Sequence, residues 1–216
     1  DLYRPYRPKR RTRATIAKEK GLEPLAALIW LQKTEEPLEN AARLYISEEK
    51  GVATEADAIA GAQDIIAESI SDNADYRTWI RRTTMKKGKV VSTAKDPDAE
   101  SVYEMYYDFE EPVSKLAGHR ILALNRGEKE KILTVKVEAP EEEITAWLER
   151  KTLRGSNPFT SPVIKEAVKD SYHRLIAPAI EREIRNDLTE KAEDGAIQVF
   201  GKNLHQLLMQ PPVAGR

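Results

Sequence analysis

The spacing of apolar residues predicts helices along most of the chain. Thr12 is a suitable N-cap for a short helix that runs to Lys20 and stops at Gly21. Pro24 is placed at the start of a second helix and Pro37 before a third, each with apolar residues a turn apart. We therefore predict that the first 53 residues form one segment, which consists of a basic N-terminal arm followed by these helices.

Residues 54–138 are predicted to hold a helix-turn-helix unit and a small β element. Thr54 caps a helix, a polar turn follows, and a second helix starts near Asn73 and ends at Gly88. We expect the second helix to be anchored to the first by Tyr76, Trp79 and Ile80.

Two β-branched stretches, residues 89–93 and 132–137, are typical of strands, and their pairing is possible. Between them, the pattern favours helix over residues 101–109, and again over 113–124, up to a turn at Arg126 and Gly127.

The remaining segment, residues 139–216, is predicted to be a scaffold built on a long helix. Pro140 starts an acid-capped helix, and one apolar stripe then continues from Ile164 to Leu188. Pro178 should kink this long helix without ending it, and a further helix is expected after Gly195. The stripe places Ile180 and Ile184 in the core, and we expect Glu181 and Arg185 to face water. The predicted fold class is mostly α: a multi-helix scaffold with a helix-turn-helix unit, a small β element and a long C-terminal helix.

The amino-acid composition excludes several classes of protein. The 216 residues include 33% charged residues and no cysteine, which excludes disulfides, thiolate catalysis and cysteine-ligated metal sites. A mean hydropathy of −0.59 leaves no room for a membrane-spanning stretch, and we expect a cytoplasmic protein without membrane contact. Asp1 is not an initiator Met, so we interpret the chain as a fragment of a longer protein.

Motifs for catalysis are missing from the sequence. The three histidines have no metal-ligand spacing, and neither a glycine-rich phosphate loop nor a G-x-S-x-G motif occurs. We therefore expect no enzyme, no cofactor and no metal site.

Basic clusters are the positive signal, although the net charge is only −1. The first contains Arg4, Arg7, Lys9, Arg10, Arg11 and Arg13. Interleaved tyrosines suit contact with a phosphate backbone and bases, but the acidic stretch 35–72 is an equally good internal partner. The second cluster contains Arg77, Arg81, Arg82, Lys86 and Lys87 on the helix after Asn73, together with Lys89 just beyond its end. It favours nucleic-acid binding, unless the acidic run 96–111 folds back on it.

Three sequence blocks resemble the bacterial Tex family of transcription accessory proteins. They are RPYRPKRRTRATIAKEKGLEPLA, GHRILALNRGE at 118–128, and EREIRNDLTEKAEDGAIQVFGKNLHQLLMQPP, which ends at Pro212. The resemblance covers essentially all 216 residues. It implies a helical region that precedes an RNase-H-like domain, followed in the family by helix-hairpin-helix and OB-type RNA-binding modules.

The resemblance implies RNA or DNA as a partner, together with intramolecular contact with those three domains. Within the second block, Arg120 and Arg126 flank an apolar helix at 121–124, with His119 beside it, so packing and capping compete with ligand contact as their role. We expect a non-catalytic scaffold of a nucleic-acid-binding transcription accessory protein. The alternative is a protein-interaction platform that docks RNA polymerase or ribosome components without touching nucleic acid.

Overall fold

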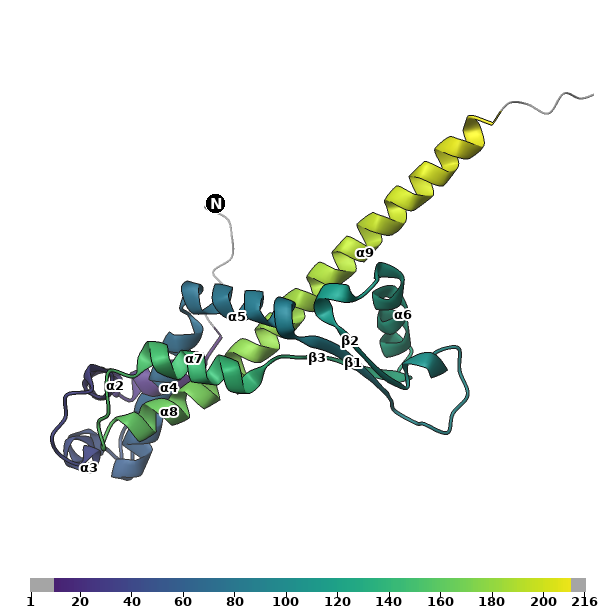
Figure 1. The fold of residues 1–216 in the computed structure, drawn as a ribbon. Coiled ribbons are helices and arrows are strands. Elements are labelled where there is room, and N and C mark those ends of the chain that lie inside the picture. Colours follow the sequence, from purple (N-terminus) through teal and green to yellow (C-terminus); the bar gives the residue numbers. More distant parts are fainter. Residues whose placement is uncertain (1–9, 211–216) are drawn as a thin grey trace, which may run out of the picture. The chain divides into compact units, whose positions relative to one another are not determined.

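The computed structural model describes residues 10–210, of which about two thirds are helical (Figure 1). The chain divides into two compact units, each built from an early and a late stretch of sequence. Unit 1 comprises the described residues up to Thr78 together with Glu142–Pro178, and unit 2 comprises Trp79–Glu141 and the residues from Ala179 onward. The mostly α fold class is confirmed, together with the small β element and the long C-terminal helix, whereas the helix-turn-helix unit stays a prediction.

Unit 1 is a helical assembly around α4 (Glu55–Ser71), which packs against α1, α2, α3, α8 and η4. These elements have the following bounds: α1 Arg13–Glu19, α2 Glu23–Leu31, α3 Leu38–Ala42, followed by the 3₁₀ turn η1 Arg43–Tyr45, α7 Glu141–Thr152, α8 Ser161–Asp170 and the π-helical η4 Ser171–Ile176. Small residues let the helices approach closely. A Cβ added to Gly61 would lie 2.3 Å from a Leu22 methyl carbon, and the Ser171 hydroxyl donates a 2.6 Å hydrogen bond to the Ala67 carbonyl.

The caps predicted for α1 and α4 are confirmed. Thr12 and Thr15 form a capping box on α1, and the Thr54 side chain accepts a hydrogen bond from the Asp57 amide. The helix predicted near Asn73 is α5 (Ala74–Lys87), and the Asn73 side chain accepts a hydrogen bond from the Tyr76 amide. The anchor of Tyr76 differs from the prediction, because its ring lies edge-on to Trp147 of α7 with the centroids 5.6 Å apart.

Unit 2 contains a three-stranded antiparallel sheet in the order β2-β1-β3. The strands are β1 (Lys89–Ala94), β2 (Asp108–Pro112) and β3 (Leu133–Glu138), and α6 (Gly118–Lys129) packs on β3. The predicted pairing of the two β-branched stretches is confirmed, with Val90 opposite Val137 and Ser92 opposite Val135. The 3₁₀ turns η2 (Glu104–Tyr106) and η3 (Val113–Lys115) flank β2.

The helix predicted over residues 101–109 is wrong. After the short turn η2, the chain enters β2, in which Phe109 and Glu111 are partly buried while Asp108, Glu110 and Pro112 are exposed. This alternation has the period of a strand, and the partner strand β1 supplies its hydrogen bonds. The predicted turn at Arg126 and Gly127 is also wrong, because α6 continues to Lys129.

The long C-terminal helix continues further than predicted. Helical residues follow one another from α8 through η4 into α9 (Ala177–Leu208), and Gly195 does not interrupt them. Pro178 has no amide hydrogen to donate and would crowd the carbonyl of residue 174. The wider π-helical hydrogen bonding of residues 171–176 lies immediately before it, and the helix continues past it.

Within unit 2, α9 lies along β3. Ile180 and Ile184 are buried, as predicted. The expectation that Glu181 and Arg185 face water is wrong: Glu181 accepts a 2.9 Å hydrogen bond from the Val137 amide, and Arg185 bonds to Glu128 and Asn125 at 2.8 Å each.

Candidate nucleic-acid interface

One side of α5 anchors the helix and the other presents cations. Ile80, Thr83 and Thr84 are buried, and the Thr84 hydroxyl bonds to the Ile80 carbonyl at 2.8 Å. Arg82 and Lys86 are exposed, and Arg81 is partly exposed. We call Arg81, Arg82 and Lys86 the α5 basic stripe.

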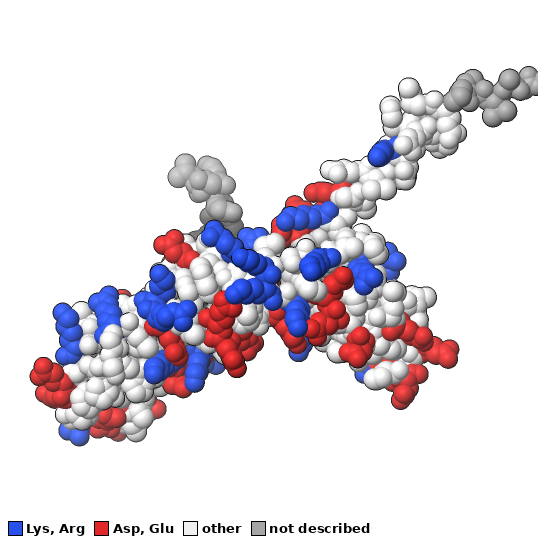
Figure 2. Space-filling model, viewed as in Figure 1, with Lys and Arg blue, Asp and Glu red and all other residues white. Residues whose placement is uncertain are grey.

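The α5 basic stripe has no carboxylate partner within residues 10–210, since none lies within 4 Å of its three cationic groups. Figure 2 shows blue side chains gathered where Figure 1 draws this part of α5. Neighbouring like charges without counter-charges create a positive potential that attracts anions.

The residues predicted beside the stripe have different surroundings. The Arg77 Nε donates a 2.5 Å hydrogen bond to the Ser71 carbonyl at the end of α4, where helix carbonyls lack internal partners. Lys87 is exposed at the end of α5. Lys89 pairs with Glu110 of β2 at 2.6 Å, and this hydrogen bond raises the pKa of the Lys89 ammonium group.

The acidic run 96–111 neutralises cations next to the stripe. Its Glu110 pairs with Lys89, and its Glu111 lies 3.5 Å from Arg120. The Arg120 guanidinium also stacks 5.6 Å from the Phe109 ring centroid, which favours a packing role for Arg120. Arg126 is exposed in the last turn of α6, on a different element from the α5 basic stripe.

The N-terminal cluster is described in part, because Arg4, Arg7 and Lys9 lie outside residues 10–210. Arg11 pairs with Glu19 at 2.8 Å. Arg10 lines a depression on α1 and α4 together with Glu68 and Asp72, and the Thr12 hydroxyl donates to Glu68 at 3.2 Å. For this described part, the contacts favour docking on the chain's own acids.

Arg13 belongs to a charged cluster between α1, α4, α8 and η4. Burial raises the pKa of Asp64, although Arg174 and Arg13 act against this rise. Asp170 accepts two hydrogen bonds from Arg174, at 2.7 and 3.0 Å, and they lower the Asp170 pKa. The charge of Arg13 acts to lower the pKa of both Asp64 and Asp170, which places it in the field of two carboxylates of unit 1.

The described part of the chain holds neither a candidate metal cluster nor a helix that could span a membrane. No group of three or more metal-ligating side chains gathers there. No helix among these residues combines the length and apolarity needed to cross a bilayer.

The structure thus gathers three of the predicted site residues into one surface without counter-charges. An aromatic contact that the sequence did not indicate lies in unit 1, where Lys151 sits 5.5 Å from the centroid of Trp147, the ring that Tyr76 meets edge-on. The spacing of Trp147 and Lys151, four residues apart on one helix, was the signal that could have shown their contact.

The fold and this surface define a helix-rich protein with a small antiparallel sheet and an exposed cationic helix face. The chain belongs to the Tex family: residues 32–200 match the family model described as Tex central region-like. The resemblance found in the sequence is therefore confirmed.

Similarity to individual relatives extends over nearly the whole chain. The chain is 51% identical to the uncharacterized protein YdcI of Bacillus subtilis over 100% of its length, and 32% identical to the transcriptional accessory protein Tex of Neisseria gonorrhoeae over 100%. It is 33% identical to the human S1 RNA-binding domain-containing protein 1 over 95% of the chain. The matched regions cover 30%, 29% and 22% of these relatives, so the chain spans less than a third of each.

Proposed function

We propose that this chain is a non-catalytic helical part of a transcription accessory protein, and that its α5 basic stripe contacts the phosphate backbone of RNA or DNA. The observation that carries the proposal is the stripe itself. Its three cations lie on a helix that is anchored by its buried side, and no carboxylate among residues 10–210 lies within 4 Å of them. Family membership supports the transcription role, and one relative is named for RNA binding.

Phosphate contact, rather than base reading, suits these side chains. Guanidinium and ammonium groups on an exposed helix face can form charge-assisted hydrogen bonds with phosphate oxygens. Such contacts position a protein on nucleic acid without reading its sequence, and they release counterions, so affinity falls as salt rises.

The first prediction tests this surface with the double variant Arg81→Glu, Arg82→Glu. We expect binding to short RNA and DNA probes to weaken to a similar extent for every probe sequence. The plot of log affinity against log salt should flatten by about 0.9 per lost contact on duplex DNA and about 0.7 on single strands. Fluorescence anisotropy at several salt concentrations measures both effects.

A matched control places the same charge change elsewhere on unit 2. Lys95→Glu with Lys129→Glu reverses two exposed cations away from α5, and its affinity should stay within about twofold of the parent. An equal loss in both double variants would mean that net charge, and not the stripe, governs binding.

The competing function is a platform that docks RNA polymerase or ribosome components. If the stripe variant kept its nucleic-acid affinity and instead lost thermal stability, the phosphate proposal would be contradicted and the platform favoured. The proposal also includes a cytoplasmic location and the absence of catalysis. Metal-dependent cleavage of RNA or DNA that a substitution within this chain abolished would refute the absence of catalysis.

A further inference from the structure

A second basic surface lies at the end of α7, within unit 1. It consists of four exposed cations, which we call the α7-end basic surface. They are Arg150 and Lys151 in the last turn of α7, Arg154 in the loop after it, and Lys33 after the end of α2. None of the four belongs to the basic clusters that the sequence pattern indicated.

A buried glutamine joins the two segments that carry this surface. Gln32 is 7% exposed, and its side-chain nitrogen donates a 2.8 Å hydrogen bond to the Thr152 carbonyl. Its side-chain oxygen accepts a 2.8 Å hydrogen bond from the backbone amide of Arg154, which is 122 residues away in the sequence. Lys33, the residue after Gln32, is thereby held near Arg154. A surface with its backbone fixed in this way loses little further freedom when it binds a ligand.

The end of α7 does not use these cations as hydrogen-bonded caps. The Thr152 hydroxyl donates to the Leu148 carbonyl, and the Leu153 amide donates to the Glu149 carbonyl, both at 2.8 Å. Within residues 10–210, the side-chain nitrogens of the four cations donate no hydrogen bond. Stabilisation of the helix end therefore leaves their N–H groups open to a ligand.

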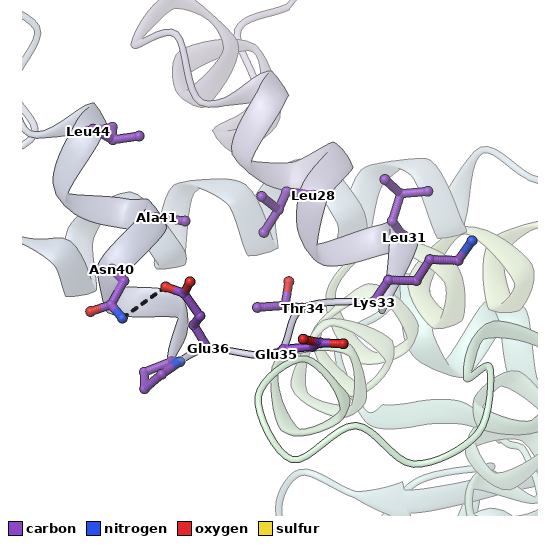
Figure 3. A pocket seen from close by; sticks show the side chains of 10 residues that line it. Leu28, Leu31, Lys33, Thr34, Glu35, Glu36, Asn40, Ala41 and Leu44 are labelled. Atoms are coloured by element: carbon purple, nitrogen blue, oxygen red, sulfur yellow. Dashed lines mark hydrogen bonds between the residues drawn. The ribbon is translucent and has the colours of Figure 1, made fainter.

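The acids nearest in the sequence do not neutralise the surface. Around the hollow between α2 and α3, Figure 3 shows the Lys33 side chain directed away from Glu35 and Glu36. Glu36 instead accepts a 3.2 Å hydrogen bond from Asn40. No carboxylate in the described part of the chain lies within 4 Å of the four cationic groups. Neighbouring cations without counter-charges attract anions.

The side chains of this surface suit a ligand that carries many phosphate groups. Guanidinium groups, such as those of Arg150 and Arg154, form paired hydrogen bonds with phosphate oxygens. The cations also come from three short stretches of chain, which suits an extended row of phosphates better than one small anion. Interfaces between proteins are depleted of lysine, whereas those with nucleic acid are rich in contacts from Arg and Lys to phosphate.

We infer that the α7-end basic surface binds the phosphate backbone of nucleic acid, as a contact separate from the α5 basic stripe. This site goes beyond the proposed function, because it uses other residues of another element and stands without the stripe. Contacts to phosphate at this surface position the chain without reading the base sequence. They also release counterions, so the affinity falls as salt rises.

The test compares the double variant Arg150→Glu, Arg154→Glu with a matched control, Lys18→Glu with Lys50→Glu, which reverses two exposed cations on other segments of unit 1. Fluorescence anisotropy with single-stranded and duplex probes measures binding. The affinity of the α7-end variant should fall at least about fivefold for every probe sequence, and that of the control should stay within about twofold. The salt dependence of binding should flatten in the α7-end variant alone.

Thermal unfolding checks that the fold is kept. The two arginine side chains are exposed and make no hydrogen bond within residues 10–210, so the melting temperature should change little. Arg150→Gln with Arg154→Gln gives the same test by a milder change, should the charge-reversed protein unfold. Its loss of affinity should be smaller and in the same direction.

Two results would overturn the inference. An equal loss in the α7-end variant and in the control would mean that the net charge of the chain governs binding. Unchanged affinity of the α7-end variant for nucleic acid would remove the contact, and loss of binding to polyglutamate in the same variant would assign the surface to an acidic protein.

The same measurements keep this inference apart from the proposed function. A loss in Arg81→Glu, Arg82→Glu but not in the α7-end variant would refute the second contact and leave the α5 basic stripe supported. A loss in the α7-end variant alone would support the second contact and contradict the proposal for the α5 basic stripe.

Discussion

Two neighbouring aspartates illustrate how surroundings set the energetic effect of a single residue. Asp64 on α4 is partly buried, and burial raises its pKa above the ordinary value of 3.8. Asp170 on α8 is held by Arg174, and the hydrogen bond lowers its pKa below that value. The charged form of Asp64 therefore opposes folding, whereas the charged form of Asp170 supports it.

The second prediction follows from this contrast. At pH 7, Asp170→Asn should lower the melting temperature, and Asp64→Asn should leave it unchanged or raise it. The loss of stability caused by charged Asp64 is present at pH values above the raised pKa that Asp64 has in the folded chain. It is relieved as the pH falls through that pKa. The Asp170 contribution persists down to pH 3.8 and is lost below.

Melting curves between pH 7 and pH 4 test both signs. The advantage of Asp64→Asn should shrink toward pH 4, while the deficit of Asp170→Asn should persist. Destabilisation by Asp64→Asn at pH 7 would show that attraction to Arg174 and Arg13 outweighs burial.

Arg185 shows where the sequence pattern stops being informative at the scale of a residue. An apolar stripe identifies Ile180 and Ile184, but it carries no information about charged neighbours that find partners on other elements. The Arg185 side chain is 15% exposed, because Asn125, Glu128 and the Val135 carbonyl come from distant parts of the sequence. Such partners are set by tertiary packing alone.

The third prediction compares Arg185→Ala with Arg182→Ala. Removing Arg185 deletes charge-assisted hydrogen bonds and should cost about 1–3 kcal/mol of unfolding free energy. Arg182 is exposed on the same helix, so its replacement should change stability by at most about 0.5 kcal/mol. Urea unfolding of both variants measures the difference, and equal values would contradict the placement of Arg185.

At the scale of elements, the sequence predicted the helices well and the sheet incompletely. Helix caps and apolar spacing are local signals, so α1, α4 and α5 begin where Thr12, Thr54 and Asn73 indicate. Strand β2 is held by hydrogen bonds to β1, and its sequence of three acids and a proline around Phe109 carries little strand propensity of its own.

The basic cluster on α5 was predicted from charge and spacing, and the structure keeps Arg82 and Lys86 exposed and Arg81 partly exposed. The alternative that the acidic run 96–111 folds back on this cluster holds for Lys89, which pairs with Glu110. Which acid meets which cation, including Glu111 beside Arg120, depends on the register of β2 against β1, and the sequence pattern did not predict that strand.

The fourth prediction compares two of the helical glycines, Gly127 of α6 and Gly195 of α9. A Cβ at Gly127 would lie 2.4 Å from a carbon of the buried Leu133, whereas nothing lies within 4 Å at Gly195. Gly127→Ala should therefore cost about 1–3 kcal/mol through overpacking, and Gly195→Ala should gain up to about 1 kcal/mol of helix propensity. Thermal unfolding of the two variants gives the signs, and a stabilised Gly127→Ala would refute the close contact with Leu133.

At the scale of the whole molecule, each unit closes by pairing early and late segments of the chain. In unit 1, α8 and η4 cover α4, and Ile164, Val168 and Tyr172 are buried. In unit 2, α9 contributes Ile180 and Ile184. Dividing the sequence into consecutive segments cannot identify such units, because long-range pairing is not encoded in local patterns.

The fifth prediction is that cutting the chain after residue 141 leaves neither fragment able to fold on its own. Residues 1–141 lack the late segments of both units, and each large apolar side chain that loses its cover forfeits about 1.5–3 kcal/mol. The fragments 1–141 and 142–216 should each lose cooperative thermal unfolding, and mixing them should restore it. A cooperative transition in 1–141 alone would show that the early segments suffice.

The hydrogen bonds from α9 to β3 also bear on solubility. An uncovered strand edge is a template on which another polypeptide can add a strand and begin aggregation. Glu181 accepts the hydrogen bond of the Val137 amide, and Arg185 donates one to the Val135 carbonyl. These are the backbone groups with which an added strand would pair. At the opposite edge, β2 ends at Pro112, which has no amide hydrogen to donate, and the exposed carboxylate of Asp108 repels its counterpart when copies approach edge to edge. Both margins of the sheet are thus protected against amyloid-like growth, one by a helix and one by charge.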